Sequence, residues 1–185
     1  NTDGIGFFKS LETLRAFHVR NKRLTILGGG GASTAIIAQA AIDGAKEITI
    51  FCRPQSVERT VATVQTIAQS TGVSLQVLPN NDSQLLAEHI NNSDLLINGT
   101  SVGMDGTSLP LPATIRFPEE LLVADVIYQP FETPLLKMAN SQGNPTINGL
   151  GMLLFQAAEA FELWTGKEMP TDLIWQLLAQ KYDIK

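Results

Sequence analysis

A run of four glycines between an apolar segment and an alanine-rich segment most limits how this chain can fold. Leu24–Leu27 predicts a short buried strand, Gly28–Gly31 a tight turn, and residues 32–41 a helix packed closely on a sheet. In this order they are typical of the phosphate-binding corner of a dinucleotide fold, where glycines let the backbone approach a pyrophosphate. The first and third glycines fit the first two positions of that motif, and Ser33 fits the third. A flexible turn without a ligand is the alternative, and the flanking strand and helix favour the phosphate site.

Apolar runs alternate with helical periodicity along the rest of the chain. They predict further strands at 46–52, 74–78, 94–98 and 121–126, and helices at 4–18, 56–70, 83–91, 133–141, 149–164 and 171–182. Nearly all-apolar strands that alternate with helices indicate a parallel sheet covered on both faces. The stretch 99–118, rich in Gly, Pro, Ser and Thr, predicts a long loop, and loops of this length in a compact domain are usually functional or mobile. We therefore expect one α/β domain over 1–185, a doubly wound parallel sheet of the Rossmann type with additional C-terminal helices.

Composition argues against several classes of function. The 185 residues carry a net charge of −5, so they offer no basic surplus for nucleic-acid phosphates. No apolar run approaches the roughly 20 residues that span a bilayer. The single cysteine, Cys52, excludes an intrachain disulfide and fits a reducing, cytoplasmic compartment. His18 and His89 fall on polar helix faces, and we expect no metal site. Trp164 and Trp175 are expected to pack in the core.

Five ordered motifs resemble the shikimate dehydrogenases. They occupy 1–7, 28–32, 98–104, 125–135 and 149–166. Family members reduce 3-dehydroshikimate to shikimate with a nicotinamide cofactor, normally NADPH, in the chorismate pathway of aromatic amino-acid biosynthesis. They carry a substrate domain ahead of the dinucleotide domain. The resemblance implies that this chain is the NADP-binding domain alone, without that substrate domain and its catalytic lysine, and that it is inactive by itself.

The resemblance also implies how the chain is arranged within the intact enzyme. Residues 1–20 would form the helix that links it to the substrate domain, and 149–185 the helices that line the cleft between the domains. The partner would be the small-molecule substrate, shikimate or 3-dehydroshikimate, with neither nucleic acid nor a membrane. Whether the intact enzyme is a homodimer stays open.

Three residues are expected to meet the substrate. By resemblance, Asp3 pairs with the lysine and hydrogen-bonds a substrate hydroxyl, which would make it catalytic as well as substrate-binding. The chemistry agrees, because hydride arriving at a ketone carbon creates an alkoxide that needs a proton. The residues alone favour a simpler role for Asp3 as the N-cap of the first helix. Tyr128 and Gln156 would bind the substrate, and a bond from Gln156 to a loop carbonyl is the alternative.

The remaining site residues are expected to hold the cofactor. Besides Arg53, the glycine turn and the resemblance give Gly28, Gly29, Gly30, Gly31, Ala32, Thr100, Ser101, Val126, Gly149 and Met152. Asp125, at the end of the last predicted strand, could instead cap local backbone amides. Gly149, Met152 and Gln156 share one helix face by their spacing.

Cofactor choice depends on Arg53, which follows the second strand. An arginine there accommodates the 2′-phosphate of NADP, whereas a carboxylate binds the ribose hydroxyl of NAD. The family's usual pattern is Asn-Arg-Thr with a second arginine shortly after, and here Cys52, Pro54 and Val57 replace three of the four. Because Arg53 is kept, NADP is expected. Because the other three residues differ, NAD or dual specificity stays open, and so does the alternative that Arg53 is simply a solvated side chain. The rival functions are an NAD-dependent quinate/shikimate dehydrogenase and a non-catalytic nicotinamide-binding module.

Overall fold

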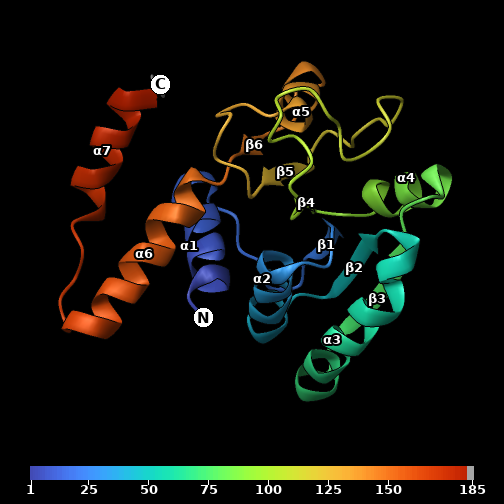
Figure 1. Cartoon of the computed structure of the whole chain (residues 1–185), viewed down its shortest axis with the longest axis horizontal. Coiled ribbons are helices and arrows are strands. Elements are labelled where there is room, and N and C mark those ends of the chain that lie inside the picture. The colour runs from blue at the N-terminus through green and yellow to red at the C-terminus, as the bar shows by residue number, and fades with distance from the viewer. Residues whose placement is uncertain (183–185) are drawn as a thin grey trace.

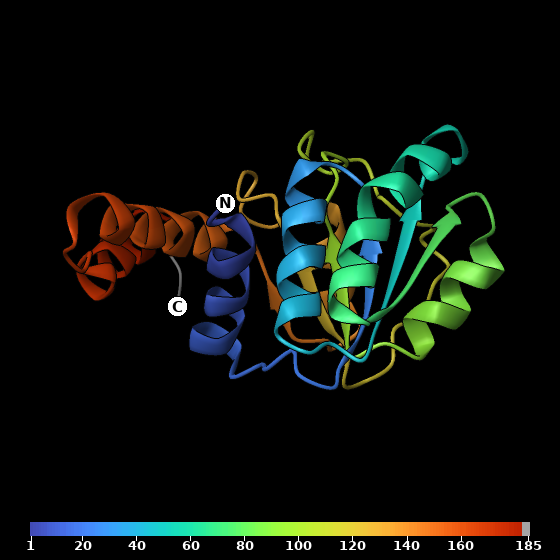
Figure 2. The ribbon, with the colours of Figure 1, turned by 90° about the horizontal axis from the view of Figure 1, so that it is seen from below.

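The computed structural model describes residues 1–182, which form a parallel sheet between two layers of helices (Figures 1 and 2). All neighbouring strands pair in parallel, in the order β3-β2-β1-β4-β5-β6. The strands are β1 Arg23–Leu27, β2 Glu47–Cys52, β3 Ser74–Pro79, β4 Leu95–Asn98, β5 Leu122–Asp125 and β6 Thr146–Ile147. The order reverses between β1 and β4, where open α/β sheets bind ligands. The predicted doubly wound α/β fold is confirmed.

Helices cover both faces of this sheet. They are α1 Asp3–Arg15, α2 Gly31–Ile42, α3 Val57–Thr71, α4 Ser83–Asn91, α5 Pro134–Ser141, α6 Leu150–Thr165 and α7 Thr171–Tyr182. Side chains of α1, α2 and α3 pack on one face, and those of α4 and α5 on the other. Helices α6 and α7 extend away from the sheet beyond α1 (Figure 2). None of the helices within 1–182 combines the length and apolar character that a bilayer crossing requires.

Side chains alternate along the strands, and the two faces differ in polarity. The α1–α2 face carries only apolar residues from the central strands, among them Ile26, Ile50 and Ile97. The α4–α5 face is apolar in its middle but polar at both ends. Thr25 and Thr49 lie near the amino ends of β1 and β2, while Asn98 and Asp125 end β4 and β5 (the other buried polar residues are Ser10, Ser33, Thr60, Thr133 and Asn144). This places a polar cluster at each end of that face.

Glycines allow α1 to lie unusually close to its neighbours. A Cβ on Gly4 would collide with the carbonyl oxygen of Ala35 on α2, and a Cβ on Gly6 would collide with the backbone of Gln156 on α6. Side chains cannot separate helices whose backbones touch, so these contacts fix α6 against the helix that Asp3 begins.

The structure departs from the predicted elements at α1 and at β6, and it adds a 3₁₀ turn at Pro54–Ser56. Helix α1 ends at Arg15 rather than at residue 18, because Ala16 adopts a left-handed conformation (φ 51°) and the Phe17 N–H bonds to the Leu11 carbonyl. Strand β6 was not predicted, since two residues are too short to carry a periodic signal.

The two tryptophans also differ from the expectation of core packing. Trp164 is 85% exposed, so that prediction is wrong, whereas Trp175 is half-buried. Trp164 is exposed because it lies in the last turn of α6, and this part of the helix projects past the sheet (Figure 2).

Candidate cofactor-binding site

The glycine turn forms the floor of the candidate site. Gly28 adopts φ +97°, a region that favours glycine, and a Cβ there would lie 2.6 Å from Thr100 Cγ2. Gly30 is the N-cap of α2 and has no capping side chain, while hypothetical Cβ atoms on Gly30 and Gly31 meet nothing within 4 Å. Ser33 donates to the carbonyl oxygen of Gly99 over 3.2 Å and so packs α2 against the end of β4. The turn thus leaves open backbone and a helix start at the sheet's carboxyl edge.

A cleft of about 390 Å³ opens above this turn. Its lining includes six of the predicted cofactor residues: Gly28, Gly29, Gly30, Arg53, Thr100 and Ser101. Gly31 and Ala32 begin α2 directly beside it. Val126, Gly149 and Met152 do not line this cleft. The structure therefore brings the predicted phosphate-side residues together and places the predicted nicotinamide-side residues next to them, around the ends of β5 and α6.

Arg59 also lines the cleft, and sequence reasoning missed it. The second arginine was sought at position 57, where the family pattern would place it. Here a 3₁₀ turn, Pro54–Ser56, precedes α3, so Arg59 falls in the first turn of that helix, facing the same cleft as Arg53. Both arginines are exposed, and neither forms an ion pair with any residue in 1–182. The proline after Arg53 was the available signal, because Pro favours the first position of a helical turn.

Asn98 and Asp125 are register partners that form a buried hydrogen-bonded network between the carboxyl ends of β4 and β5. The Asn98 Nδ2 donates to both Asp125 carboxylate oxygens at 3.1 Å. Asp125 also accepts from the Ile127 N–H at 3.0 Å and the Thr133 hydroxyl at 2.7 Å. Burial raises the pKa of Asp125 to about 6, and these hydrogen bonds oppose that rise. Capping of a local amide, as expected for Asp125, is only one part of this network.

The predicted nicotinamide-side residues lie around the loop that follows β5. Gly149 packs directly on this loop, since a Cβ there would collide with the Val126 carbonyl oxygen, and its N–H donates to the Ile127 carbonyl at 3.0 Å. Met152 lies in the first turn of α6 and is buried. Val126 and Gly149 are therefore in backbone contact, as a shared binding edge would require.

The predicted substrate residues lie outside the cleft. Asp3 is the first residue of α1, Thr2 is the N-cap, and no side-chain capping bond forms, so the N-cap alternative for Asp3 is wrong. Gln156 is half-buried on α6, and its amide bonds to no residue within 1–182, which also removes the loop-carbonyl alternative. Tyr128 is 43% exposed. The close packing of α1 on α6 brings the helices of Asp3 and Gln156 together.

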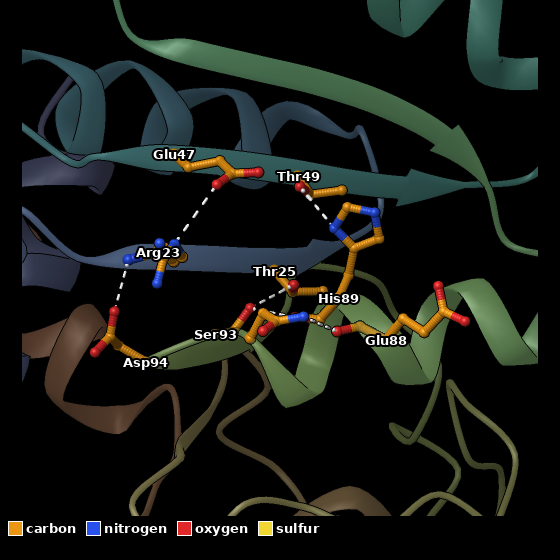
Figure 3. Close-up of polar contacts among 9 residues, drawn as sticks. Arg23, Thr25, Glu47, Thr49, Glu88, His89, Ser93 and Asp94 are labelled. Atoms are coloured by element: carbon orange, nitrogen blue, oxygen red, sulfur yellow. Dashed lines mark hydrogen bonds and ion pairs between the residues drawn. The ribbon is translucent and has the colours of Figure 1, made fainter.

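A second polar pocket, of about 280 Å³, lies at the opposite, amino edge of the sheet (Figure 3). The Thr49 hydroxyl lies 3.2 Å from His89 Nδ1, and the Thr25 hydroxyl lies 2.7 Å from that of Ser93. The His89 ring meets Phe51 edge-on, with 5.5 Å between ring centroids. The prediction that His89 lies on a polar helix face is therefore wrong, because α4 turns it toward the sheet.

Strand order, glycine turn and cleft together define a dinucleotide-binding domain of the Rossmann class. The family model for the shikimate 5′-dehydrogenase C-terminal domain matches residues 149–179. The chain is 80% identical, over all 185 residues, to a shikimate dehydrogenase (NADP(+)) of Streptococcus suis, of which it covers 64%. A shikimate dehydrogenase (NADP(+)) of Streptococcus mutans is 56% identical and is also covered to 64%. The chain thus matches the shikimate dehydrogenase family, as its motifs predicted, and it spans 64% of the length of these two relatives.

Solved structures of shikimate dehydrogenases are also similar to this chain. The crystal structure of shikimate 5-dehydrogenase from Listeria monocytogenes in complex with shikimate and NAD has a TM-score of 0.89 and 42% identity, covering 96% of this chain and 62% of that one. The shikimate 5-dehydrogenase of Thermus thermophilus, in complex with NADP(H) and shikimate, has a TM-score of 0.74 and 32% identity, covering 93% and 59%.

Proposed function

We propose that this chain is the NADP-binding part of a shikimate dehydrogenase, an oxidoreductase that interconverts 3-dehydroshikimate and shikimate. One observation carries the proposal: a single cleft joins an uncapped glycine turn to two arginines that have no ion pair within residues 1–182. The names of the relatives support both the activity and the cofactor. Cytoplasmic location follows as part of the same proposal.

The chain's own residues divide the work of holding the cofactor. The open backbone of the glycine turn and the start of α2, at Gly31 and Ala32, would bind the pyrophosphate through N–H groups. Arg53 and Arg59 would bind the 2′-phosphate by charge-assisted hydrogen bonds. Thr100, Ser101, Val126, Gly149 and Met152 would line the path to the nicotinamide. The bound cofactor supplies the hydride.

The substrate would lie between this domain and the part of the enzyme that the chain does not span. We propose that Gln156 and the Tyr128 hydroxyl hydrogen-bond the substrate, because the family resemblance gives them this role and both side chains are at least partly exposed. Asp3 would accept a hydrogen bond from a substrate hydroxyl. It would also keep the lysine of the substrate domain charged, so that this lysine can protonate the alkoxide. On this proposal residues 1–20 link the two parts, residues 149–185 line the cleft between them, and the chain alone does not turn over shikimate.

An NAD-dependent enzyme is the second candidate, and a specific observation favours it. The Listeria monocytogenes relative carries NAD, and here only Arg53 keeps the family's phosphate-binding pattern. Arg59 decides between the two candidates, because a second cation in the cleft would favour NADP.

The test is to titrate NADP⁺ and NAD⁺ into the wild-type chain and into Arg53→Ala, Arg59→Ala and the double variant. Each charge-assisted contact contributes about 1.5–3 kcal/mol, so each substitution should weaken NADP⁺ binding about tenfold or more and leave NAD⁺ binding nearly unchanged. Arg116→Ala is the matched control, because Arg116 is exposed and outside the cleft. An unchanged ratio of NADP⁺ to NAD⁺ affinity in the double variant would refute the assignment, and no binding of either cofactor would refute the function.

A further inference from the structure

The buried network at the ends of β4 and β5 forms hydrogen bonds with two loops at once. The Asn98 Oδ1 accepts from the Thr100 N–H at 3.1 Å and from its hydroxyl at 2.7 Å, and the Asn98 Nδ2 also donates to the Val102 carbonyl at 3.0 Å. Asp125 in turn holds the Ile127 N–H of the next loop. These loops carry Thr100 and Val126, and they follow neighbouring strands on the same side of the strand-order reversal.

Every group that contacts the Asp125 carboxylate is a donor. The Asn98 side-chain NH₂ and the Ile127 backbone N–H can only donate, so neither could accept a hydrogen bond from a protonated Asp125. The Thr133 hydroxyl could reverse, but its oxygen already accepts from the Leu136 N–H at 3.3 Å, and its hydrogen would then lose the carboxylate. If the Asn98 amide were flipped, its NH₂ group would face the Thr100 N–H, and two donors cannot bond to each other. The network is therefore complete only when Asp125 is ionised.

We infer that Asp125 is a positioning residue for the nicotinamide end of the cofactor: its ionised carboxylate holds the loops after β4 and β5 in the geometry that binds the nicotinamide. This inference rests on the proposed cofactor-binding function and extends it to a residue that touches no cofactor. Gly149 transmits the same geometry to α6, because its N–H bonds to the Ile127 carbonyl.

The surroundings of Asp125 make its charge sensitive to pH. Strand β4 presents Asn98, the loop after β5 presents Ile127, and the start of α5 presents Thr133, none of which titrates. No ion pair within residues 1–182 involves Asp125, and no charged side chain contributes to its raised pKa of about 6. The carboxylate is thus ionised above about pH 6, and it gains its proton below that value.

The experiment compares NADP⁺ with 2′-phospho-ADP-ribose, which lacks only the nicotinamide. The ratio of their dissociation constants isolates the nicotinamide contact and cancels titration of the shared 2′-phosphate. In the wild-type chain, we expect the preference for NADP⁺ to be full at about pH 7.5 and to fall severalfold by about pH 5.5. In Asp125→Asn, the preference for NADP⁺ should be about tenfold lower at every pH, and the dissociation constant of 2′-phospho-ADP-ribose should change little. Asp43→Asn, at the far end of α2, is the matched control.

A second pair of variants separates positioning from folding, in case Asp125→Asn does not fold. Thr133→Val removes a hydrogen bond that lowers the pKa of Asp125, so the pH midpoint of the NADP⁺ preference should move upward. Thr133→Ser keeps the hydroxyl and should keep the midpoint. A preference that stays flat with pH in the wild type, or a midpoint that Thr133→Val leaves in place, would overturn the inference while the cofactor still binds. Failure of both ligands to bind the wild type would overturn the proposed function and this inference together.

Discussion

Two polar clusters lie at opposite ends of the same face of the sheet, and they differ in where their hydrogen bonds lead. At the amino edge, the hydroxyls of Thr25 and Thr49 bond to side chains at the end of α4, and the bonds stay within this group (Figure 3). At the carboxyl edge, Asn98 and Asp125 bond to each other and then to the backbone of two loops. One cluster attaches a helix to the sheet, whereas the other shapes loops beside a cleft.

The difference shows how a structural polar pocket can be distinguished from a binding site. At the amino edge the Arg23 guanidinium is already paired with Glu47 at 3.7 Å, and the Arg23 backbone N–H donates to the Asp94 carboxylate at 2.8 Å. At the carboxyl edge Arg53 and Arg59 have no such partner within residues 1–182, and the backbone of the glycine turn is open. Two cations and open backbone donors that line one cleft indicate an anionic ligand, because such a ligand would form charge-assisted hydrogen bonds with them.

The largest effect is expected for Asp3, the first residue of α1; the N-terminal end of this helix lies on the same side as the carboxyl ends of the strands (Figure 2). In a complete enzyme that also contains the substrate domain, Asp3→Ala should lower kcat by about 10²–10⁴-fold, because proton transfer to the alkoxide loses its support. The dissociation constant of NADP⁺ should stay nearly unchanged. Steady-state kinetics and cofactor titration measure both, with Asp43→Asn as the control. Full kcat with a lower melting temperature would show that Asp3 acts only on the stability of α1.

At neutral pH the buried carboxylate of Asp125 should lower the stability of the folded chain, whereas the Thr49 hydroxyl at the amino edge carries no charge. The pKa of Asp125 is about 6 in the folded chain, against an ordinary value of 3.8, so the folded chain binds more protons between these values. The free energy of unfolding should therefore fall as the pH rises from about 4 to about 6, by up to about 3 kcal/mol. Asp125→Asn should remove this dependence in urea titrations, whereas Thr49→Val should keep it. Equal pH dependence in the wild type and Asp125→Asn would contradict the assignment.

Two glycines of the carboxyl edge should respond in opposite ways. Gly99→Ala places a Cβ against the Ser33 hydroxyl and should cost about 1–3 kcal/mol of unfolding free energy, since a packed contact must open. Gly30→Ala meets no atom of the chain within 4 Å, so it should leave stability nearly unchanged and weaken NADP⁺ binding. Thermal melts and cofactor titrations on both variants measure the contrast. If Gly30→Ala bound NADP⁺ as well as the wild type does, the pyrophosphate would not lie on this turn.

The smallest effect is expected at the amino edge. Thr49→Val keeps the shape of the side chain but removes its contact with His89 Nδ1, and should cost about 1 kcal/mol of unfolding free energy. Because this cluster reaches no cleft loop, the dissociation constant of NADP⁺ should not change. Chemical denaturation and cofactor titration of the same preparation decide the point. A loss of cofactor affinity as large as that of Arg53→Ala would show that the two edges are coupled.

Much of the fold could be read from the sequence because its signals are local. The apolar run of β1, the glycines after it and the alanines of α2 are adjacent in the chain, and each obeys a short-range rule of backbone geometry. Gly28, Gly29 and Gly30, which line the cleft, belong to the same local motif. Strand β6 could not be predicted in this way, because it depends on pairing with β5. The early end of α1 could not be predicted either, because it depends on the left-handed conformation of Ala16.

The sequence by itself determined the fold class, the glycine turn and the family that the motifs resemble, since these depend on residue types at fixed spacing. Only the tertiary structure decided that Arg59 shares a cleft with Arg53, that His89 faces the sheet, and that Asn98 and Asp125 meet. The physical reason is separation along the chain: Asn98 and Asp125 are 27 residues apart, and parallel pairing of β4 with β5 brings them together. The raised pKa of Asp125 has the same origin, because burial is a property of the packed chain and of no local segment.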